Sequence, residues 1–217
     1  MKNYRQKIAE QSEDDFKKFC LSNQISCIKI DDNNDQREMY LTEPGRKSPD
    51  FLCIKNELSL FVEIKTRTTF ASDTKMREIT KEARAKKATG QSGIASFSFD
   101  PIADAKNTFI YYAKNASMKF KNIKKEFNFP RVLILCGYIN STDVNVIYFS
   151  RKDNYKLMDN KLIYNGLVKD GPGVLDSTGS NISAIVYWNK DLKRYEGSEN
   201  PNGIIPLPNS TFEKFFS

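Results

Sequence analysis

The residues whose types and spacing could do chemistry are two carboxylic acids and an amine in one short stretch, Asp50, Glu63 and Lys65. Two apolar runs, residues 51–54 and 58–64, accompany them and are separated by a short polar break. This pattern predicts a β-hairpin, with Asp50 opening the first strand and the other two near the end of the second. Since strand side chains alternate between faces, Glu63 and Lys65 share one face.

The loop of this hairpin decides whether the two carboxylates meet. If residues 56–57 form a two-residue loop, Asp50 stands directly opposite Glu63, with Cα atoms roughly 5 Å apart. Lys55 would then pair with Leu58. A four-residue loop also keeps both acids on one face, whereas a three-residue loop separates them unless a bulge intervenes. Asn-Glu is not a favoured sequence for a tight hairpin turn, so the two-residue loop is a preference.

Two carboxylates that face each other repel unless one is protonated or a cation bridges them. A hard divalent ion with oxygen ligands, Mg²⁺ or Mn²⁺, is the natural bridge for Asp50 and Glu63. Lys65 would add a positive group beside a water or a phosphate at that ion. The three residues therefore predict a carboxylate metal site with a neighbouring lysine.

Pro49-Asp50, the hairpin and the Glu63-Ile64-Lys65 triplet resemble the motif of the PD-(D/E)xK nuclease superfamily. The resemblance implies that Asp50, Glu63 and the backbone carbonyl of Ile64 bind the metal. It also implies that Lys65 positions the attacking water or stabilises the developing charge. The alternative interpretation of the same residues is a surface hairpin whose charged side chains are solvated neighbours without a metal.

The resemblance implies a Mg²⁺-dependent nuclease that hydrolyses phosphodiester bonds, with DNA favoured over RNA. Restriction, repair, junction-resolving and defence enzymes share this core, and the sequence does not distinguish among them or between endonuclease and exonuclease. In this superfamily an acidic residue of the first helix often reaches the metal. Glu13 is the nearest match, with Glu10 second, and a solvated helix face explains either one equally well.

The elements that must position these residues follow the order of a restriction-endonuclease-like αβββαβ core, in which helices flank a central mixed sheet. The expected elements are a helix at 2–23, a strand at 25–30, a loop at 31–47, the hairpin, helices at 74–89 and 103–127, and strands at 131–139 and 144–149. Residues 90–101 fit a loop or a strand. We therefore expect an α/β fold with the nuclease-like core in residues 1–149.

Residues 150–217 lie beyond the resemblance and predict a C-terminal extension, with extra strands and loops, packed on the same domain. Residues 155–158 and 161–167 predict a small hairpin, and residues 182–188 predict a strand. The proline-containing tail predicts an extended segment that ends in a short turn at 212–216.

The net charge of +7 and the isoelectric point near 9.1 suit a polyanionic partner such as nucleic acid. Five basic residues are placed to contact it: Lys47, Arg67, Arg77, Lys81 and Arg84. The last three are spaced to share one face of a helix and could follow a phosphate backbone. A solvated basic face explains them equally well.

The chain contains no histidine, which excludes Ser-His-Asp hydrolases, HNH and HD phosphohydrolases and His-bearing zinc deaminases. Glycine-rich nucleotide-binding motifs are also absent. Its four cysteines, Cys20, Cys27, Cys53 and Cys136, include no Cys-x-x-Cys pair, so neither a zinc ribbon nor a disulfide scaffold is indicated. Cys53 and Cys136 are expected to be buried small hydrophobes.

Residues 1–15 are too charged for a signal peptide, and no apolar run has membrane-spanning length, which predicts a cytoplasmic protein without a membrane partner. A homodimer is compatible with the expected fold. Two other function classes stay open. A nucleic-acid-binding module that does not cut would be favoured by acids more than about 8 Å apart or by a lack of metal binding. A protein-interaction scaffold would show salt-insensitive or absent nucleic-acid binding.

Overall fold

The computed structural model of this chain describes residues 4–68, 71–90, 101–137, 151–158, 161–169, 173, 175–176, 179–189, 194–208 and 211–216. Within them, one central sheet has the strand order β1-β2-β3-β4-β7-β8. The strands are β1 Ser26–Lys29, β2 Phe51–Lys55, β3 Leu58–Arg67, β4 Arg131–Gly137, β7 Ala184–Asn189 and β8 Arg194–Glu199. The first three are antiparallel, β3, β4 and β7 run parallel, and β8 is antiparallel to β7. The expected α/β fold with a mixed central sheet is confirmed.

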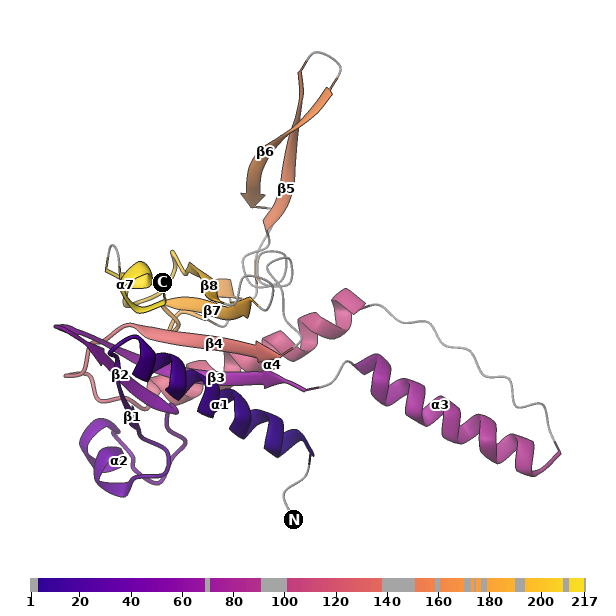
Figure 1. The fold of residues 1–217 in the computed structure, drawn as a ribbon, viewed down its shortest axis with the longest axis horizontal. Helices are drawn as coiled ribbons and strands as arrows, with labels where there is room; N and C mark the ends of the chain where they lie inside the picture. The colour runs from indigo at the N-terminus through magenta and orange to yellow at the C-terminus, as the bar shows by residue number, and fades with distance from the viewer. Residues whose placement is uncertain are drawn as a thin grey trace.

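Two long helices cover opposite faces of this sheet (Figure 1). These two are α1 Tyr4–Ser22 and α4 Pro101–Lys121. The other helices are α2 Asn34–Tyr40, α3 Ala71–Ala88 and α7 Thr211–Phe216. Phe16 of α1 packs in the same buried cluster as Val62, whereas Phe109 of α4 packs with Phe61. Because side chains alternate along a strand, the odd-numbered residues of β3, which include Glu63, face α4.

The β2–β3 hairpin has the two-residue loop that brings the acids together. Lys55 pairs with Leu58, and Phe51 pairs with Val62. Asn56 adopts a left-handed backbone conformation with φ of 55°, which asparagine tolerates better than most residues. The expected register is therefore confirmed, and the Asp50 amide extends the pairing by donating to the Val62 carbonyl at 3.1 Å.

One predicted loop contains a helix, and one predicted helix is shorter than expected. Residues 31–47 were expected to be a loop, but α2 forms there because the Asn33 side chain accepts a hydrogen bond from the Gln36 amide and caps the helix. The helix expected at 103–127 ends at Lys121 instead. Beyond it, Ile123 bridges to Leu41, so the chain leaves the helix to pair with the segment after α2.

The C-terminal part of the chain contributes two strands to the central sheet, of which β7 was expected and β8 was not. The small hairpin is confirmed and longer than expected, with β5 Arg151–Met158 paired to β6 Lys161–Lys169. It forms a ribbon that projects from the rest of the molecule (Figure 1). The possible strand in residues 90–101 and the strand expected at 144–149 lie outside the described residues.

Candidate functional site

Asp50 and Glu63 meet around the ammonium group of Lys119, which reaches them from α4. Lys119 Nζ lies 3.0 Å from Asp50 Oδ1, 2.7 Å from Glu63 Oε1 and 2.8 Å from Glu63 Oε2. Three carboxylate oxygen atoms therefore surround one positive charge. The two acids are also closer than the separation of about 8 Å that would have favoured a site unable to share a metal.

Lys65 and the backbone of Ile64 complete this group. Lys65 Nζ donates to Glu63 Oε1, and the Ile64 amide donates to Asp50 Oδ2 at 2.7 Å. Glu63 has no exposed surface and Asp50 is 5% exposed, whereas the Lys65 side chain retains 19%. Asp50 is therefore held by a backbone hydrogen bond on one oxygen, and Lys65 lies on the more accessible side of Glu63.

Burial changes the proton affinity of these groups. Removal from water and the nearby charge of Asp50 raise the pKa of Glu63 to about 7, against the opposing effects of Lys65 and Lys119. Burial by itself lowers the pKa of Lys119, but the two carboxylates outweigh that effect, and the pKa is raised overall. Lys119 is therefore a stable cation, while Glu63 is close to its titration point near neutral pH.

Glu13, expected at the metal, lies elsewhere. It belongs to α1, on the sheet face opposite the one that Glu63 occupies, and it forms an ion pair with Lys29 at 3.0 Å. Glu13 is therefore placed beside Lys29 on the α1 face, and it is not among the residues that contact Lys119. Glu10, the second choice, is exposed on the same helix.

Asp31, which follows β1, is an acid that sequence reasoning placed only in a loop. Burial and the charge of Asp50 raise the pKa of Asp31, so the two carboxylates are near enough to interact. One of its oxygen atoms, Oδ1, is buried without a hydrogen-bond partner and lies 3.9 Å from Lys29 Nζ. Asp31 is therefore a half-buried acid that interacts with the charge of Asp50, and Lys29 lies between it and Glu13.

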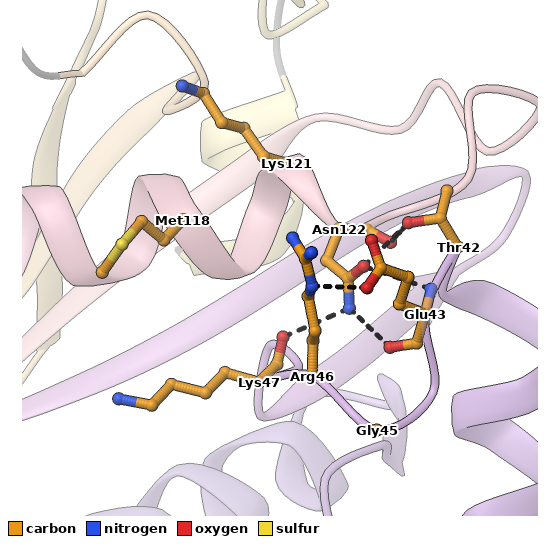
Figure 2. A pocket seen from close by; sticks show the side chains of 8 residues that line it. All are labelled: Thr42, Glu43, Gly45, Arg46, Lys47, Met118, Lys121 and Asn122. Atoms are coloured by element: carbon orange, nitrogen blue, oxygen red, sulfur yellow. Dashed lines mark hydrogen bonds and ion pairs between the residues drawn. The ribbon is translucent and has the colours of Figure 1, made fainter.

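A pocket of about 640 Å³ lies where the segment after α2 meets the end of α4 (Figure 2). Its lining includes three basic side chains, Arg46, Lys47 and Lys121. Arg46 is paired with Glu43 at 2.5 Å, while Lys47 and Lys121 are exposed. Lys47 was expected to contact nucleic acid, and it is placed on the wall of an open, positively charged pocket.

The other expected nucleic-acid contacts differ in exposure. Lys81 and Arg84 are exposed on α3, as a backbone contact requires, and α3 also contains Arg77. Arg67, in contrast, is only 3% exposed, and its guanidinium lies 5.5 Å from the centre of the Phe109 ring. The expectation for Arg67 is not met, because its position on β3 directs it under α4.

Lys119 is the member of the site that sequence reasoning missed. It lies in the sequence between Ala116 and Phe120, which with Phe109 and Ala113 form the buried apolar stripe of α4. A lysine at the edge of such a stripe is carried toward the sheet, where it needs a buried acid as a partner. The position of Lys119 beside the apolar stripe is the feature of the sequence that could have identified it.

Comparison with known proteins identifies no relative: no family model matches the chain, and neither a curated protein nor a solved structure matches it significantly. The described part of the chain contains no helix that is both long and apolar enough to cross a membrane. The structure itself shows an α/β fold and a group of two buried acids and two partly buried lysines. That group is the feature of the molecule that points to a function.

Proposed function

We propose that this protein is a Mg²⁺- or Mn²⁺-dependent nuclease of the PD-(D/E)xK superfamily that hydrolyses phosphodiester bonds, with DNA as the favoured substrate. The observation that carries the proposal is the convergence of Asp50, Glu63 and Lys65: Lys65 bonds Glu63, and three oxygen atoms of the two acids lie within 3.0 Å of Lys119 Nζ. A polypeptide rarely buries two acids together without a use for a shared positive charge.

The order and pairing of the elements support the superfamily assignment. The segment α1-β1-β2-β3-α4-β4 contains an antiparallel three-stranded unit followed by a strand parallel to β3, with a helix on each face. This order corresponds to the αβββαβ core that the sequence resemblance implies, with α2 and α3 as additions. The acids lie at the start of β2 and near the end of β3, which are adjacent strands.

The donor set fits a hard divalent cation. Asp50 and Glu63 would hold the ion through carboxylate oxygen atoms, the ligands that Mg²⁺ and Mn²⁺ prefer. Lys119 would leave the position between the acids, since its ammonium and the ion satisfy the same three oxygen atoms. When bound, the ion would supply charge neutralisation for the phosphate and a lowered pKa for a water molecule.

Three lysines of the chain would contact the phosphates of the substrate. Lys65, paired with Glu63 and partly exposed, would stabilise the negative charge that develops on the phosphate. Lys47 and Lys121 would hold the neighbouring phosphates of the strand at the pocket wall. The net charge of +7 would draw a polyanion toward this surface.

A nucleic-acid-binding module that does not cut is the second candidate, and one observation favours it. Lys119 already neutralises the two acids without a metal, which is how a chain that had lost catalysis would satisfy them. The basic pocket and α3 would serve such a module equally well.

Cleavage of plasmid, linear, single-stranded and branched DNA and of RNA, in Mg²⁺, Mn²⁺ or EDTA, tests the proposal. We expect cleavage that needs the metal and that is lost in both Asp50→Ala and Lys65→Ala, while Lys114→Ala, an exposed change on α4, keeps full activity. Full cleavage by both site variants would refute the assignment. Metal-independent binding without cleavage of any substrate would establish the second candidate instead.

A further inference from the structure

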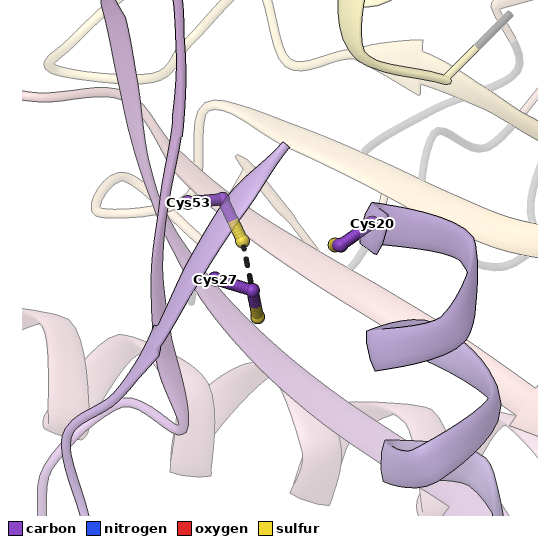
Figure 3. A group of neighbouring side chains, drawn as sticks. All are labelled: Cys20, Cys27 and Cys53. Atoms are coloured by element: carbon purple, nitrogen blue, oxygen red, sulfur yellow. Dashed lines mark hydrogen bonds between the residues drawn. The ribbon is translucent and has the colours of Figure 1, made fainter. Parts of the chain in front are cut away.

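Three cysteines that are distant in the sequence, Cys20, Cys27 and Cys53, gather on the α1 face of the sheet (Figure 3). Their sulfur atoms all lie within 4.8 Å of one another, and Cys27 Sγ lies 3.9 Å from Cys53 Sγ. The fourth cysteine, Cys136, is buried in the same apolar cluster but is not part of the trio. Within the described part of the chain, these three cysteines form a cluster of possible metal ligands, because each offers a sulfur atom close to the other two.

The sheet register brings two of these side chains together. Cys27 of β1 pairs directly with Cys53 of β2. The Ile30 amide donates to the Asp50 carbonyl, and hydrogen-bonded and non-hydrogen-bonded pairs alternate along an antiparallel ladder. The Cys27–Cys53 pair is therefore a non-hydrogen-bonded pair, in which side chains approach most closely.

Cys20 is added from the end of α1. The Ile25 amide donates to the Cys20 carbonyl at 2.8 Å, which fixes the turn between α1 and β1 at this residue. Cys20 and Cys53 are each 1% exposed, whereas Cys27 is partly exposed. The trio thus has a buried interior and one side open to an incoming ion.

The spacing suits three thiolates on one metal ion. Sulfur atoms bound at about 2.3 Å to a tetrahedral zinc ion stand about 3.8 Å apart, close to the 3.9 Å between Cys27 and Cys53. A disulfide would need the two sulfur atoms at about 2.0 Å. A small movement of Cys20 would bring the third sulfur atom into the same arrangement.

The surroundings select a soft cation. The neighbours in this cluster are apolar, among them Phe16, Ile25 and Leu60, and the ligand group itself contains only sulfur. Thiolates favour Zn²⁺ and Cu⁺ over the hard ions that carboxylates bind. Lys17 is close enough for its charge to act on Cys27 and would offset the negative charge of a three-thiolate complex.

We propose that Cys20, Cys27 and Cys53 form a three-thiolate site for a thiophilic cation, Zn²⁺ or Cu⁺. This site lies on the sheet face opposite Glu63, so it is separate from the carboxylate site and does not depend on nuclease activity. The bound ion joins α1 to β1 and β2. Cu⁺ would be complete with three ligands, whereas Zn²⁺ would take a fourth ligand from the open side at Cys27.

Metal titration of the reduced, chelator-treated full chain under anaerobic conditions tests this site. Co²⁺ is the spectroscopic probe for the zinc arm, because thiolate ligation gives it a charge-transfer absorption band. Zn²⁺ should displace it, and Cu⁺ is titrated separately against a chromogenic Cu⁺ chelator. We expect one equivalent of Co²⁺ or Cu⁺ to bind with sulfur ligation and to raise the melting temperature.

Cys27→Ser is the test variant, since its partial exposure makes loss of folding the smallest concern, and Cys136→Ser is the matched buried control. We expect Cys27→Ser to weaken binding at least about 10-fold and Cys136→Ser to leave it unchanged. The site would be overturned by a lack of sulfur-ligated metal in the wild-type chain, or by equal affinity in the wild type and in folded Cys27→Ser. Formation of a Cys27–Cys53 disulfide in air, without metal uptake under reducing conditions, would also overturn it.

Discussion

Lys119 Nζ lies 2.8 Å from Glu63 Oε2, although the two residues are 56 positions apart in the chain. The contact joins α4 to the central strand β3 and leaves Glu63 with no exposed surface. Because the same ammonium also bonds Asp50, the pair of acids is neutralised by the protein itself. Metal binding at this site must therefore compete with Lys119, which makes that residue the first to test.

Lys119→Met should destabilise the metal-free protein by about 3 kcal/mol, because it leaves two buried acids without their shared cation. Added Mg²⁺ should recover part of that loss, since an ion that binds only the folded state stabilises it. Urea unfolding in EDTA and in Mg²⁺ measures both effects. The control is Lys114→Met, an exposed change on the same helix. Equal loss of stability with and without Mg²⁺ would contradict a metal site between the acids.

Glu63 should make the stability of the metal-free protein fall as the pH rises toward neutrality. Its pKa of about 7 in the folded protein is above the ordinary value of 4.5, so the folded state binds more protons between these two values. The stabilisation is complete below about pH 4.5 and is lost as the pH passes through 7, with a total of about 3 kcal/mol.

Unfolding in urea with EDTA, measured from pH 5 to pH 8, checks this dependence. Glu63→Gln cannot titrate, so its stability should change less over the same range than that of the wild type. Identical pH profiles for the two proteins would show that Glu63 does not titrate in this interval.

Arg84→Glu should weaken DNA binding and reduce the dependence of log K on log salt by about 1, as expected when one phosphate contact is lost. Arg84 is exposed on α3, where a backbone could reach it. The charge-matched control is Lys18→Glu, an exposed change on α1. Fluorescence anisotropy at several salt concentrations measures the slope, and an equal effect of both changes would leave only the net charge as the cause.

Cys27 should react with iodoacetamide before the other cysteines in the reduced, metal-free protein at pH 6. Hydrogen bonds with Cys20 and Cys53, together with the charge of Lys17, lower the pKa of the Cys27 thiol below its ordinary value. Its neighbours in the trio are buried. Peptide mapping by mass spectrometry identifies the alkylated residue, and prior addition of Zn²⁺ should protect it. Faster modification of Cys20 or Cys53 would contradict the expected order.

The sequence was informative where the structure is local. The two-residue loop of the hairpin follows from apolar runs that flank a short polar break, and its register determines that Asp50 and Glu63 share one face. The helix that became α4 was predicted because helical periodicity is contained in a single segment. In both cases the pattern that predicts the structure lies within one short segment of the sequence.

The rest depends on contacts between distant segments. Lys119 joins the acids, and Ile123 pairs with Leu41 to end α4 early, because of packing that no single segment encodes. The cysteine trio combines a helix end with two strands, so the spacing of cysteines along the chain did not reveal it. The face of the sheet on which α1 packs, and with it the position of Glu13, likewise depends on contacts between distant segments.

The hairpin that carries the two acids forms from neighbouring residues, whereas the helix that carries Lys119 packs on it through contacts between distant segments. β2 and β3 are joined by two residues, and such a hairpin closes on a timescale of about 1–10 μs. β3 meets β4 in a parallel pair only after the chain has crossed through α3 and α4, which is a slow, non-local step. We therefore expect Asp50 and Glu63 to meet before Lys119 reaches them, so that a change at Lys119 alters the unfolding rate more than the folding rate.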